Sequence, residues 1–490
     1  MPTLPRSHRR QSGIYTRRRL LQGVLGVAGV GLLAACNGQG TSGTVASSSA
    51  VVATTALTAR TTLAATAIDR TSATGAPPAA ATTAPAVGTT NSVNLQLFTG
   101  AKIRGQWLSA VAKMKAQEQG TPITLDVQVV GNWVAVTDKL QTILAGGATP
   151  PDLVDVADYQ FPRWIGPGRG APFVPLNDRL QGRAKDLFTP SALDPWTWEG
   201  KYYALGDELN ASLLSVRSDL FKQAAVDPAK IVTWDDFLQI GRKIKTVATS
   251  GITYWSAPDF TYLAMQAGGG IFAGDGKPTV NSAINVQTLT FVQNAIVKEQ
   301  VVLLDPGGKA TPQLVKSGAV AAMTGPAWKF SGYVTQWAPE SSGEWRLQPL
   351  PTWSQSGAHA SWSQGGTGTA VPATGKQTAA ALDFLFYANL TKAVLLDYDI
   401  RTNFPTWRGA YSDPKLQQPV AFFGGQTPAS LIAKAAADMA PFVASPVYPE
   451  VSSLVNKAVT AVLQGQQAPA AALDAVQQQA MGLYTAAQKQ

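Results

Sequence analysis

The sequence has very few residues of the kinds that hold metals or cross-link a chain. Among 490 residues there is one cysteine, Cys36, and there are two histidines, His8 and His359. A single cysteine excludes a disulfide within the chain and a zinc site built on cysteines. Two histidines so far apart also exclude a histidine-rich metal site. We therefore predict no metal and no cofactor.

Charged side chains are also scarce, at 14% of the chain, although the net charge is +9. Residues 1–35 carry six arginines and no acidic residue. Subtracting those six charges leaves +3 for the rest, an ordinary value that gives no indication of nucleic-acid binding. A chain of 490 residues is too long for one compact core, so two lobes are expected.

Residues 1–35 have the composition of an export signal. Residues 16–36 read TRRRLLQGVLGVAGVGLLAAC, a basic segment followed by about 14 apolar residues and small residues before a cysteine. The apolar run is short for a membrane span. The final LAAC resembles a bacterial lipobox, which implies cleavage before Cys36 and its lipidation. The alternative is that Cys36 is a buried small hydrophobe. The TRRRLL segment resembles a twin-arginine export signal, and general secretion stays open.

Residues 36–90 are dominated by Thr, Ser, Ala, Gly and Pro without apolar periodicity. Such a segment buries too little apolar surface to offset the entropy lost on ordering. We predict a disordered tether with a root-mean-square span of about 40 Å. Its Ser and Thr content makes it a candidate for O-glycosylation.

Alternating and helical apolar patterns then predict an α/β fold. Residues 93–98, 125–130 and 152–156 have the pattern of strands, and residues 102–118 and 134–145 that of helices. This βαβαβ order implies parallel strands with right-handed crossovers.

The loops after these three strands are candidate ligand contacts, because open parallel sheets bind ligands at the carboxyl ends of their strands. They supply Thr99, Trp133, Asp158 and Tyr159. For the two aromatic residues an equally good alternative is that they cap the sheet edge as part of the core.

The stretch of residues 198–237 connects this sheet to the rest of the chain. Two extended runs, residues 201–205 and 211–216, flank Gly206-Asp207-Glu208, and helices capped by Ser218 and Thr233 follow. Further on, Gly276-Lys277 lacks the spacing of a phosphate-binding loop.

Several segments, taken in order, resemble the extracellular solute-binding proteins of ABC importers, specifically the sugar-binding group of maltose-binding type (family 1). The resemblance covers about residues 91–490. The matching segments are LAGGATPPDLVDV, WEGKYYAL, LLSVRSDLFKQAAVD, TWDDFLQIGRKI, LVKSGAVAAMTGPAW, GGTGTAVPATGKQTAAALDFLFYANLTK and VLQGQQAPAAALDAV.

The resemblance implies a periplasmic-binding-protein-like fold, with two α/β lobes, a three-crossing hinge and a ligand cleft between the lobes. The crossings are expected near residues 205–209, 365–370 and 403–410. Lobe 1 would comprise residues 91–206 and 370–402, and lobe 2 residues 209–365 and 408–490. A monomeric, lipid-anchored receptor facing the extracytoplasmic side would bind a sugar or oligosaccharide and deliver it to an ABC permease, without enzymatic activity. Where the family usually has Pro, this chain has Gly206, which predicts a looser first crossing.

A sugar site needs aromatic planes for C–H faces and polar groups for hydroxyls. The aromatic candidates lie in or beside irregular segments that contain Gly, Pro or Ser: Trp255, Trp328, Trp362, Trp407 and Tyr448. The alternative for each is packing in the core, and it is favoured for Trp234 and Trp345.

The acidic pair Asp207-Glu208 has three interpretations: hydrogen-bond acceptors for the ligand, solvated hinge charges, or the acid pair of a glycosidase. Neighbouring residues on a strand point to opposite faces, so these two carboxylates do not face each other across a bond. We expect Glu208 to look into the cleft. The functional alternatives left open are an exported carbohydrate-active hydrolase, a receptor for a polyamine or organic anion, and a cell-surface adhesion module.

Overall fold

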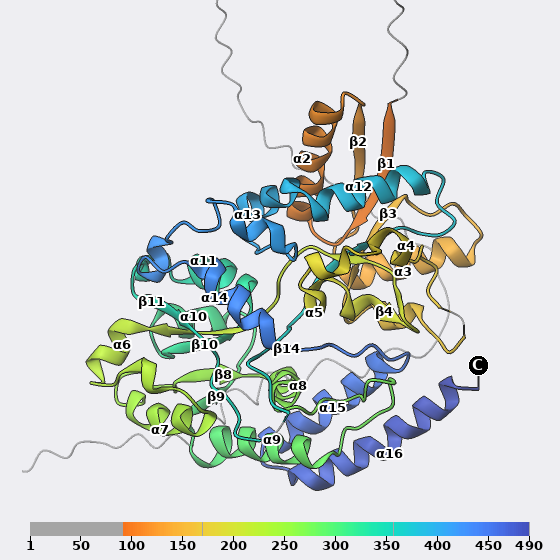
Figure 1. Cartoon of the computed structure of the whole chain (residues 1–490). Helices are drawn as coiled ribbons and strands as arrows, with labels where there is room; N and C mark the ends of the chain where they lie inside the picture. The colour runs from red at the N-terminus through yellow and green to blue at the C-terminus, as the bar shows by residue number, and fades with distance from the viewer. Residues whose placement is uncertain (1–91, 169, 356, 490) are drawn as a thin grey trace, which may run out of the picture. The chain divides into compact units, whose positions relative to one another are not determined.

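The structure of the chain is a computed structural model that describes residues 92–168, 170–355 and 357–489 (Figure 1). The predicted signal peptide, Cys36 and the predicted tether of residues 36–90 lie outside the described residues.

The first lobe is built on a five-stranded sheet with the order β2-β1-β3-β13-β6. β1 pairs in parallel with β2 and β3, while β13 is antiparallel to β3 and β6. The predicted βαβαβ unit is therefore confirmed. Its elements are β1 (Val93–Thr99), α2 (Lys102–Gln119), β2 (Ile123–Val129), α3 (Trp133–Ala145) and β3 (Leu153–Ala157), and the sheet is completed by β6 (Leu205–Gly206) and β13 (Thr367–Ala370).

The apolar stripe of α2 explains how this sheet is covered. Trp107, Leu108 and Val111 are buried against the strands in one core cluster. The helix ends at Gly120, whose φ of 66° is the left-handed conformation that glycine adopts without a Cβ clash.

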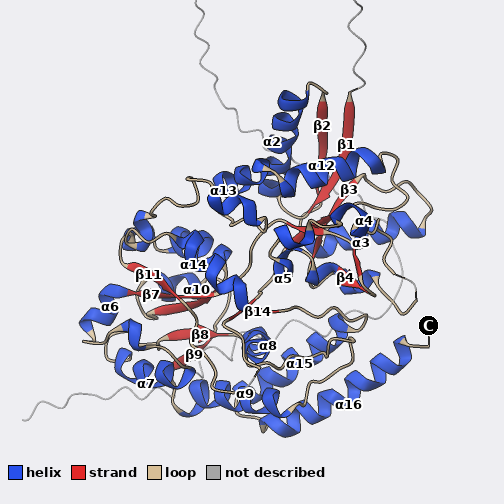
Figure 2. Ribbon diagram, in the orientation of Figure 1, coloured by secondary structure: helices blue, strands red, loops and turns tan. Residues whose placement is uncertain are grey.

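The second lobe contains a three-stranded antiparallel sheet with the order β10-β7-β11 and a separate parallel pair, β8-β9. Figure 2 shows β1, β2 and β3 in one group of strands and β7, β8, β9 and β11 in another. The strands are β7 (Leu213–Arg217), β8 (Thr253–Trp255), β9 (Val302–Leu304), β10 (Ala322–Gly325) and β11 (Trp345–Gln348), and two short pairs are β4 (Thr197–Trp198) with β5 (Lys201–Tyr202) and β12 (Ser361–Trp362) with β14 (Met439–Ala440).

Helices surround these sheets, and the four helices that the sequence predicts are present as α2, α3, α6 and α7. Thr233 caps α7 through a capping box with Asp236, as expected of Thr at this position. Ser218 is not a cap: it is the first helical residue of α6, and its hydroxyl donates to the Glu344 carbonyl at 2.8 Å. The α-helices are α4 (Asn177–Leu180), α5 (Thr189–Ala192), α6 (Ser218–Gln223), α7 (Trp234–Ile244), α8 (Ala257–Gln266), α9 (Ala283–Gln293), α10 (Ala310–Lys316), α11 (Thr335–Trp337), α12 (Thr378–Leu390), α13 (Leu395–Arg401), α14 (Pro428–Ala435), α15 (Tyr448–Leu463) and α16 (Pro469–Ala487).

Two π-helical segments and several 3-10 turns were not predicted. The π-helical segments are η5 (Asn294–Lys298) and η6 (Trp328–Val334). The 3-10 segments are η1 (Phe161–Trp164), η2 (Ala184–Asp186), η3 (Asp194–Trp196), η4 (Pro228–Lys230), η7 (Pro339–Ser341), η8 (Lys392–Val394), η9 (Arg408–Ser412), η10 (Ala421–Phe423) and η11 (Ala436–Asp438).

Within the described part of the chain, no single helix is long and apolar enough to cross a membrane. One bent pair, residues 378–390 with 392–401, reaches the required length and composition only in combination.

The three predicted crossing segments lie side by side. Gly206 pairs with Gly368 of β13, and Glu208 forms an antiparallel bridge with Pro405. The Leu209 N–H donates to the Phe404 carbonyl at 2.7 Å. The hinge is therefore a small backbone ladder rather than three independent linkers.

The prediction that Gly206 loosens the first crossing is wrong. A Cβ at this position would lie 2.4 Å from the Ser191 carbonyl oxygen and 2.6 Å from the Trp196 ring. A Cβ placed at Gly368 would lie 2.7 Å from the same Trp196 ring. The indole of Trp196 is fully buried and donates to the Val156 carbonyl at 2.9 Å. The glycines therefore allow a tryptophan to pack directly on the hinge backbone.

Candidate functional site

Asp158 lies at the carboxyl end of β3, where the sequence predicts a ligand contact. Its side chain is only 6% exposed, and its backbone N–H donates to the Gly366 carbonyl at the second crossing, at 3.0 Å. The pKa of Asp158 is raised to about 7, mainly by burial; the Tyr159 N–H opposes the rise and the Glu208 carboxylate adds to it. The backbone bond to Gly366 places Asp158 beside the second crossing of the hinge.

Glu208 is the half-buried member of the acidic pair, whereas Asp207 is fully buried. That Glu208 looks into the cleft stays a prediction. Its carboxylate accepts a hydrogen bond from the Asn403 amide at 2.7 Å. Burial raises the pKa of Glu208, with Arg401 and Arg104 opposing and Asp207 adding to the rise. Asn403 belongs to the third crossing, so the orientation of this carboxylate is fixed by a second hinge segment.

Two phenols of lobe 2 have raised pKa values. Burial raises the pKa of Tyr262, on α8, and the nearby Tyr448 and Asp158 raise it further. Tyr448, at the start of α15, also has a pKa raised by burial and by Asp158. Tyr448 also packs against core clusters of both lobes, so it lies at the boundary between them.

Trp328 brings an aromatic plane to the second crossing. It is half-buried, and its indole N–H donates to the Gln364 carbonyl at 3.1 Å. Its ring lies 3.8 Å from a Cβ placed at Gly365. The hydrogen bond fixes the ring plane while leaving part of the ring accessible, as a stacking residue requires.

An open cavity of about 510 Å³ lies farther along the line where the lobes meet. Lobe 1 lines it with Trp198 and Glu199, and lobe 2 with Phe442 and Asp275. Phe442 packs on Tyr448, with 4.9 Å between ring centroids. The polar site and this cavity are therefore neighbours along the boundary between the lobes.

Two predicted stacking residues are core residues. Trp255 is 1% and Trp362 is 2% exposed, and both belong to the main core of lobe 2. They surround Trp234, with centroid separations of 5.7 and 6.5 Å. Their prediction as ligand contacts is wrong, because Gly- and Ser-containing neighbours mark a break in regular structure but do not say which way a side chain points.

Thr99 is not a ligand contact in this structure. It is fully buried, and its hydroxyl bonds to the backbone of Ala101, accepting from the N–H at 3.3 Å. The short polar side chain closes the turn between β1 and α2, which is a common role for Thr after a strand.

Three further residues were predicted as ligand contacts, with packing in the core as the alternative. Tyr159 is 40% exposed beside Asp158 and stays a candidate. Trp133 lies over Gly100, where a Cβ would be 2.4 Å from its ring, so it covers the end of β1. Trp407 packs against the cores of both lobes and forms a bridge with Leu187. Trp407 therefore supports the hinge, which corrects its prediction as a ligand contact.

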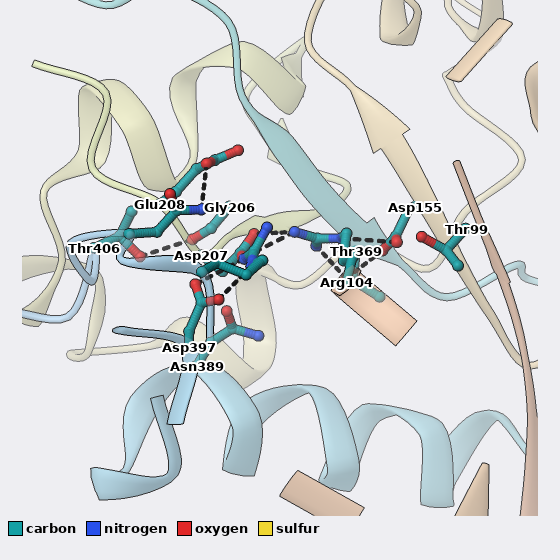
Figure 3. Close-up of polar contacts among 12 residues, drawn as sticks. Thr99, Arg104, Asp155, Gly206, Asp207, Glu208, Thr369, Asn389, Asp397 and Thr406 are labelled. Carbon is teal, nitrogen blue, oxygen red and sulfur yellow. Dashed lines mark hydrogen bonds and ion pairs between the residues drawn. The ribbon is translucent and has the colours of Figure 1, made fainter. Parts of the chain in front are cut away.

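The sequence interpretation missed a buried charge network, drawn in Figure 3. Arg104 on α2 forms ion pairs with Asp155 and Asp207, both at 2.7 Å. Arg401 at the end of α13 pairs with Asp207 and with Asp397. The available signal was an arginine on the apolar side of a helix, since Arg104 precedes the buried Trp107 by three residues.

The comparisons with known proteins agree with the two-lobed fold. The binding protein of B. animalis subsp. lactis Bl-04, solved with beta-1,6-galactobiose, has a TM-score of 0.64, with 81% of this chain and 99% of that chain covered at 21% identity. Maltose-bound MalE3 of T. maritima has a TM-score of 0.64 at 19% identity, with 80% and 100% covered. These likenesses confirm the class of fold: two α/β lobes of the periplasmic binding type.

Residues 101–394 match the profile of the bacterial extracellular solute-binding proteins, and the chain belongs to this family. It is 29% identical to the arabinooligosaccharide-binding protein of Halalkalibacterium halodurans over 265 residues, which is 52% of this chain and 58% of the relative. This chain thus spans less than two thirds of that relative's length. The arabinooligosaccharide-binding protein of Bacillus subtilis (strain 168) is 26% identical over 69% of this chain and 80% of its own length. The lactose-binding protein of Rhizobium radiobacter is 29% identical over 60% of this chain and 70% of its own length.

Proposed function

We propose that this protein is an exported receptor that binds a sugar in the space between its lobes and delivers it to an ABC permease. The observation that carries the proposal is that residues of both lobes meet at the hinge. Asp158 and Trp328 are hydrogen-bonded to neighbouring residues of the second crossing, Glu208 is bonded to the third, and Tyr448 packs against the cores of both lobes. Carboxylates and phenols suit hydroxyls, and the indole suits a C–H face. The sugars in the names of the related proteins support the same class of ligand.

The purified protein is expected to gain thermal stability from one group of sugars. A ligand that binds only the folded state stabilises it by about 2.7 kcal/mol at one hundred times its Kd. Differential scanning fluorimetry with arabinose, lactose, maltose and their oligomers, alongside spermidine and citrate, measures this directly. Stabilisation by spermidine or citrate alone would overturn the sugar assignment and retain a receptor.

The receptor is proposed to have no glycosidase activity. Of the adjacent pair at the first crossing, Asp207 is held in ion pairs with Arg104 and Arg401, and neighbouring residues of an extended strand point to opposite faces, so the two carboxylates do not flank one glycosidic bond. A bound oligosaccharide should be recovered intact after prolonged incubation. Release of shorter products that stops in the Asp158→Asn variant would establish an enzyme instead.

The membrane attachment is proposed to be a lipid on Cys36, with the binding unit a monomer on the extracytoplasmic side. The LAAC sequence supports this part of the proposal. The Cys36→Ala variant should appear in the soluble fraction after export, and its unchanged retention on membranes would contradict the anchor.

Asp158 should make the ligand-free protein less stable as the pH rises. The folded-state pKa of Asp158, about 7, lies above its unfolded value of about 3.9. The stabilisation that this carboxyl gives the folded state is therefore fully present below about pH 4 and is lost as the pH rises through 7. Asp158→Asn should therefore stabilise the protein by roughly 2 kcal/mol more at pH 8 than at pH 5. Urea unfolding at both pH values tests this, with Asp126→Asn, an exposed position on β2, as the control. An equal effect at both pH values would contradict the buried carboxyl.

A further inference from the structure

Gln364 is a buried side chain of the hinge whose amide has no partner in the described part of the chain. The residue is only 9% exposed, and its Oε1 atom is buried without a hydrogen-bond donor. Buried polar groups are nearly always paired, because an unpaired one loses its hydration without replacement. Exchanging the amide oxygen and nitrogen would leave a buried N–H without an acceptor instead. In either orientation, the fold alone does not account for this amide.

The two other buried glutamines of the described residues have partners within the protein. Gln266, on α8, accepts from the Trp234 indole at 2.8 Å and donates to the Pro351 carbonyl at 2.9 Å. Gln160 accepts from the Arg163 guanidinium at 3.0 Å. These amides are buried because they cross-link segments of the fold. Gln364 differs from both, since its amide cross-links no described segment.

The backbone of Gln364 is held on two sides. Its N–H donates to the carbonyl of Asn210, just after the first crossing, at 3.4 Å. Its carbonyl accepts from the Trp328 indole at 3.1 Å. The Asn210 amide in turn donates to the Gly365 carbonyl at 3.0 Å. Both backbone groups of Gln364 are therefore occupied, and the side-chain amide is its remaining hydrogen-bonding group.

The amide lies in the stretch of the second crossing that contacts both lobes. Trp328 of lobe 2 is bonded to residue 364, and the Asp158 N–H of lobe 1 donates to the Gly366 carbonyl at 3.0 Å. Trp328 is itself half-buried, so this stretch borders an accessible surface. Gln364 thus stands beside two candidate ligand contacts, with a fixed backbone and an unused amide.

We propose that Gln364 determines ligand specificity, its amide accepting a hydrogen bond from one hydroxyl of the bound sugar. This inference rests on the proposed sugar-receptor function. A ligand with hydrogen in place of that hydroxyl would leave the buried acceptor unpaired, and such a mismatch is a strong source of discrimination. Stacking on an indole, by contrast, needs only a C–H face and distinguishes hydroxyl patterns poorly. The amide therefore selects among sugars that fit the same space.

Titration calorimetry on the whole protein tests this with arabinose, lactose, maltose and their oligomers and, for the sugar that binds, its monodeoxy analogues. The unmodified protein should bind one analogue at least about tenfold more weakly than the parent sugar, the size of one unpaired buried group. Gln364→Met keeps the length of the side chain and should bind the parent sugar about tenfold more weakly. It should no longer distinguish the parent sugar from that analogue, which assigns the lost contact to one hydroxyl.

Thermal unfolding of the ligand-free proteins separates recognition from folding. Gln364→Met removes an unpaired acceptor and should not lower the melting temperature. Gln266→Met breaks the bonds to Trp234 and Pro351, so it should lower the melting temperature and leave the discrimination between sugars unchanged.

Three results would overturn the inference alone. They are unchanged sugar affinity in Gln364→Met, an equal loss of affinity for the parent sugar and every analogue, and a fall in melting temperature as large as that of Gln266→Met. The last two would assign the amide to the fold. Binding of no carbohydrate by the unmodified protein would instead overturn the receptor function on which the inference rests.

Discussion

The Asp207→Ala variant is expected to lose about 3–5 kcal/mol of unfolding free energy, the usual cost of removing one partner of a buried ion pair. Asp207 is fully buried and accepts hydrogen bonds from Arg104 at 2.7 and 2.8 Å. It also pairs with Arg401. Its removal leaves two buried guanidinium groups with one carboxylate fewer, and a buried charge without a partner is costly.

The Asp207→Ala substitution should affect more than the ion pairs of Asp207 itself, because the charge network extends to other groups. Arg104 Nη2 donates to the Thr369 hydroxyl at 3.0 Å, and that hydroxyl donates to Asp155 at 2.8 Å (Figure 3). Arg401 donates to Asp397 at 2.7 Å. The groups come from α2, β3, β13, α13 and the first crossing, so this network joins the sheet of lobe 1 to the hinge. We expect Asp207→Ala to alter lobe closure as well as stability.

The pKa of Asp207 determines how the stability of the protein depends on pH. Burial alone would raise the pKa of Asp207, but Arg104 and Arg401 lower it below its ordinary value. A lowered folded-state pKa stabilises the protein above the unfolded pKa of about 3.9, and the stabilisation is lost as the pH falls through the folded value. As the pH falls below about 4, the unfolding free energy of Asp207→Asn should therefore decrease less steeply than that of the unmodified protein.

Urea unfolding at pH 7 measures the change, and an exposed ion pair provides the control. Arg179 and Asp383 pair on the surface, with side chains 41% and 59% exposed. Asp383→Ala should cost at most about 1 kcal/mol, as exposed pairs do. If Asp207→Ala cost no more than Asp383→Ala, the network would not stabilise the hinge.

The Trp328→Ala variant should lose at least about thirtyfold of its sugar affinity, which corresponds to the 2 kcal/mol or more of a central aromatic anchor. The ring is oriented by its bond to the Gln364 carbonyl and stands at the second crossing. Trp328→Phe keeps a smaller stacking face and loses this hydrogen bond, so its affinity should fall between the two. Titration calorimetry at constant salt measures all three proteins.

A matched control separates stacking from stability. Trp353 is also half-buried, but it packs on Phe291 and Trp234 at the edge of the lobe 2 core. Trp353→Ala should lower the melting temperature while leaving sugar affinity within about twofold, because surface-to-core packing changes act mainly on folding. Equal losses of affinity in both variants would show that Trp328 acts through the fold and not through the ligand.

The amino-acid sequence by itself determined the elements and the class of the protein. Alternating and helical periodicities place β1, α2, β2, α3 and β3 within two residues of their observed ends. The Thr233 and Asp236 pair marks the start of α7, since capping depends on residues three apart in the chain. The ordered motifs indicate the family to which the chain belongs. All of these signals are local, or repeat in a fixed order.

Only the tertiary structure decided which side chains form the site and what holds the hinge together. Trp255, Trp362 and Trp328 all follow irregular or glycine-containing segments, yet two are buried around Trp234 and one meets the second crossing. The ion-pair partners Arg104 and Asp207 are 103 residues apart, and Gly206 is explained only by the Trp196 ring packed on it. The direction of a side chain and the partner of a buried charge depend on segments distant in sequence, and chain folding alone brings those segments together.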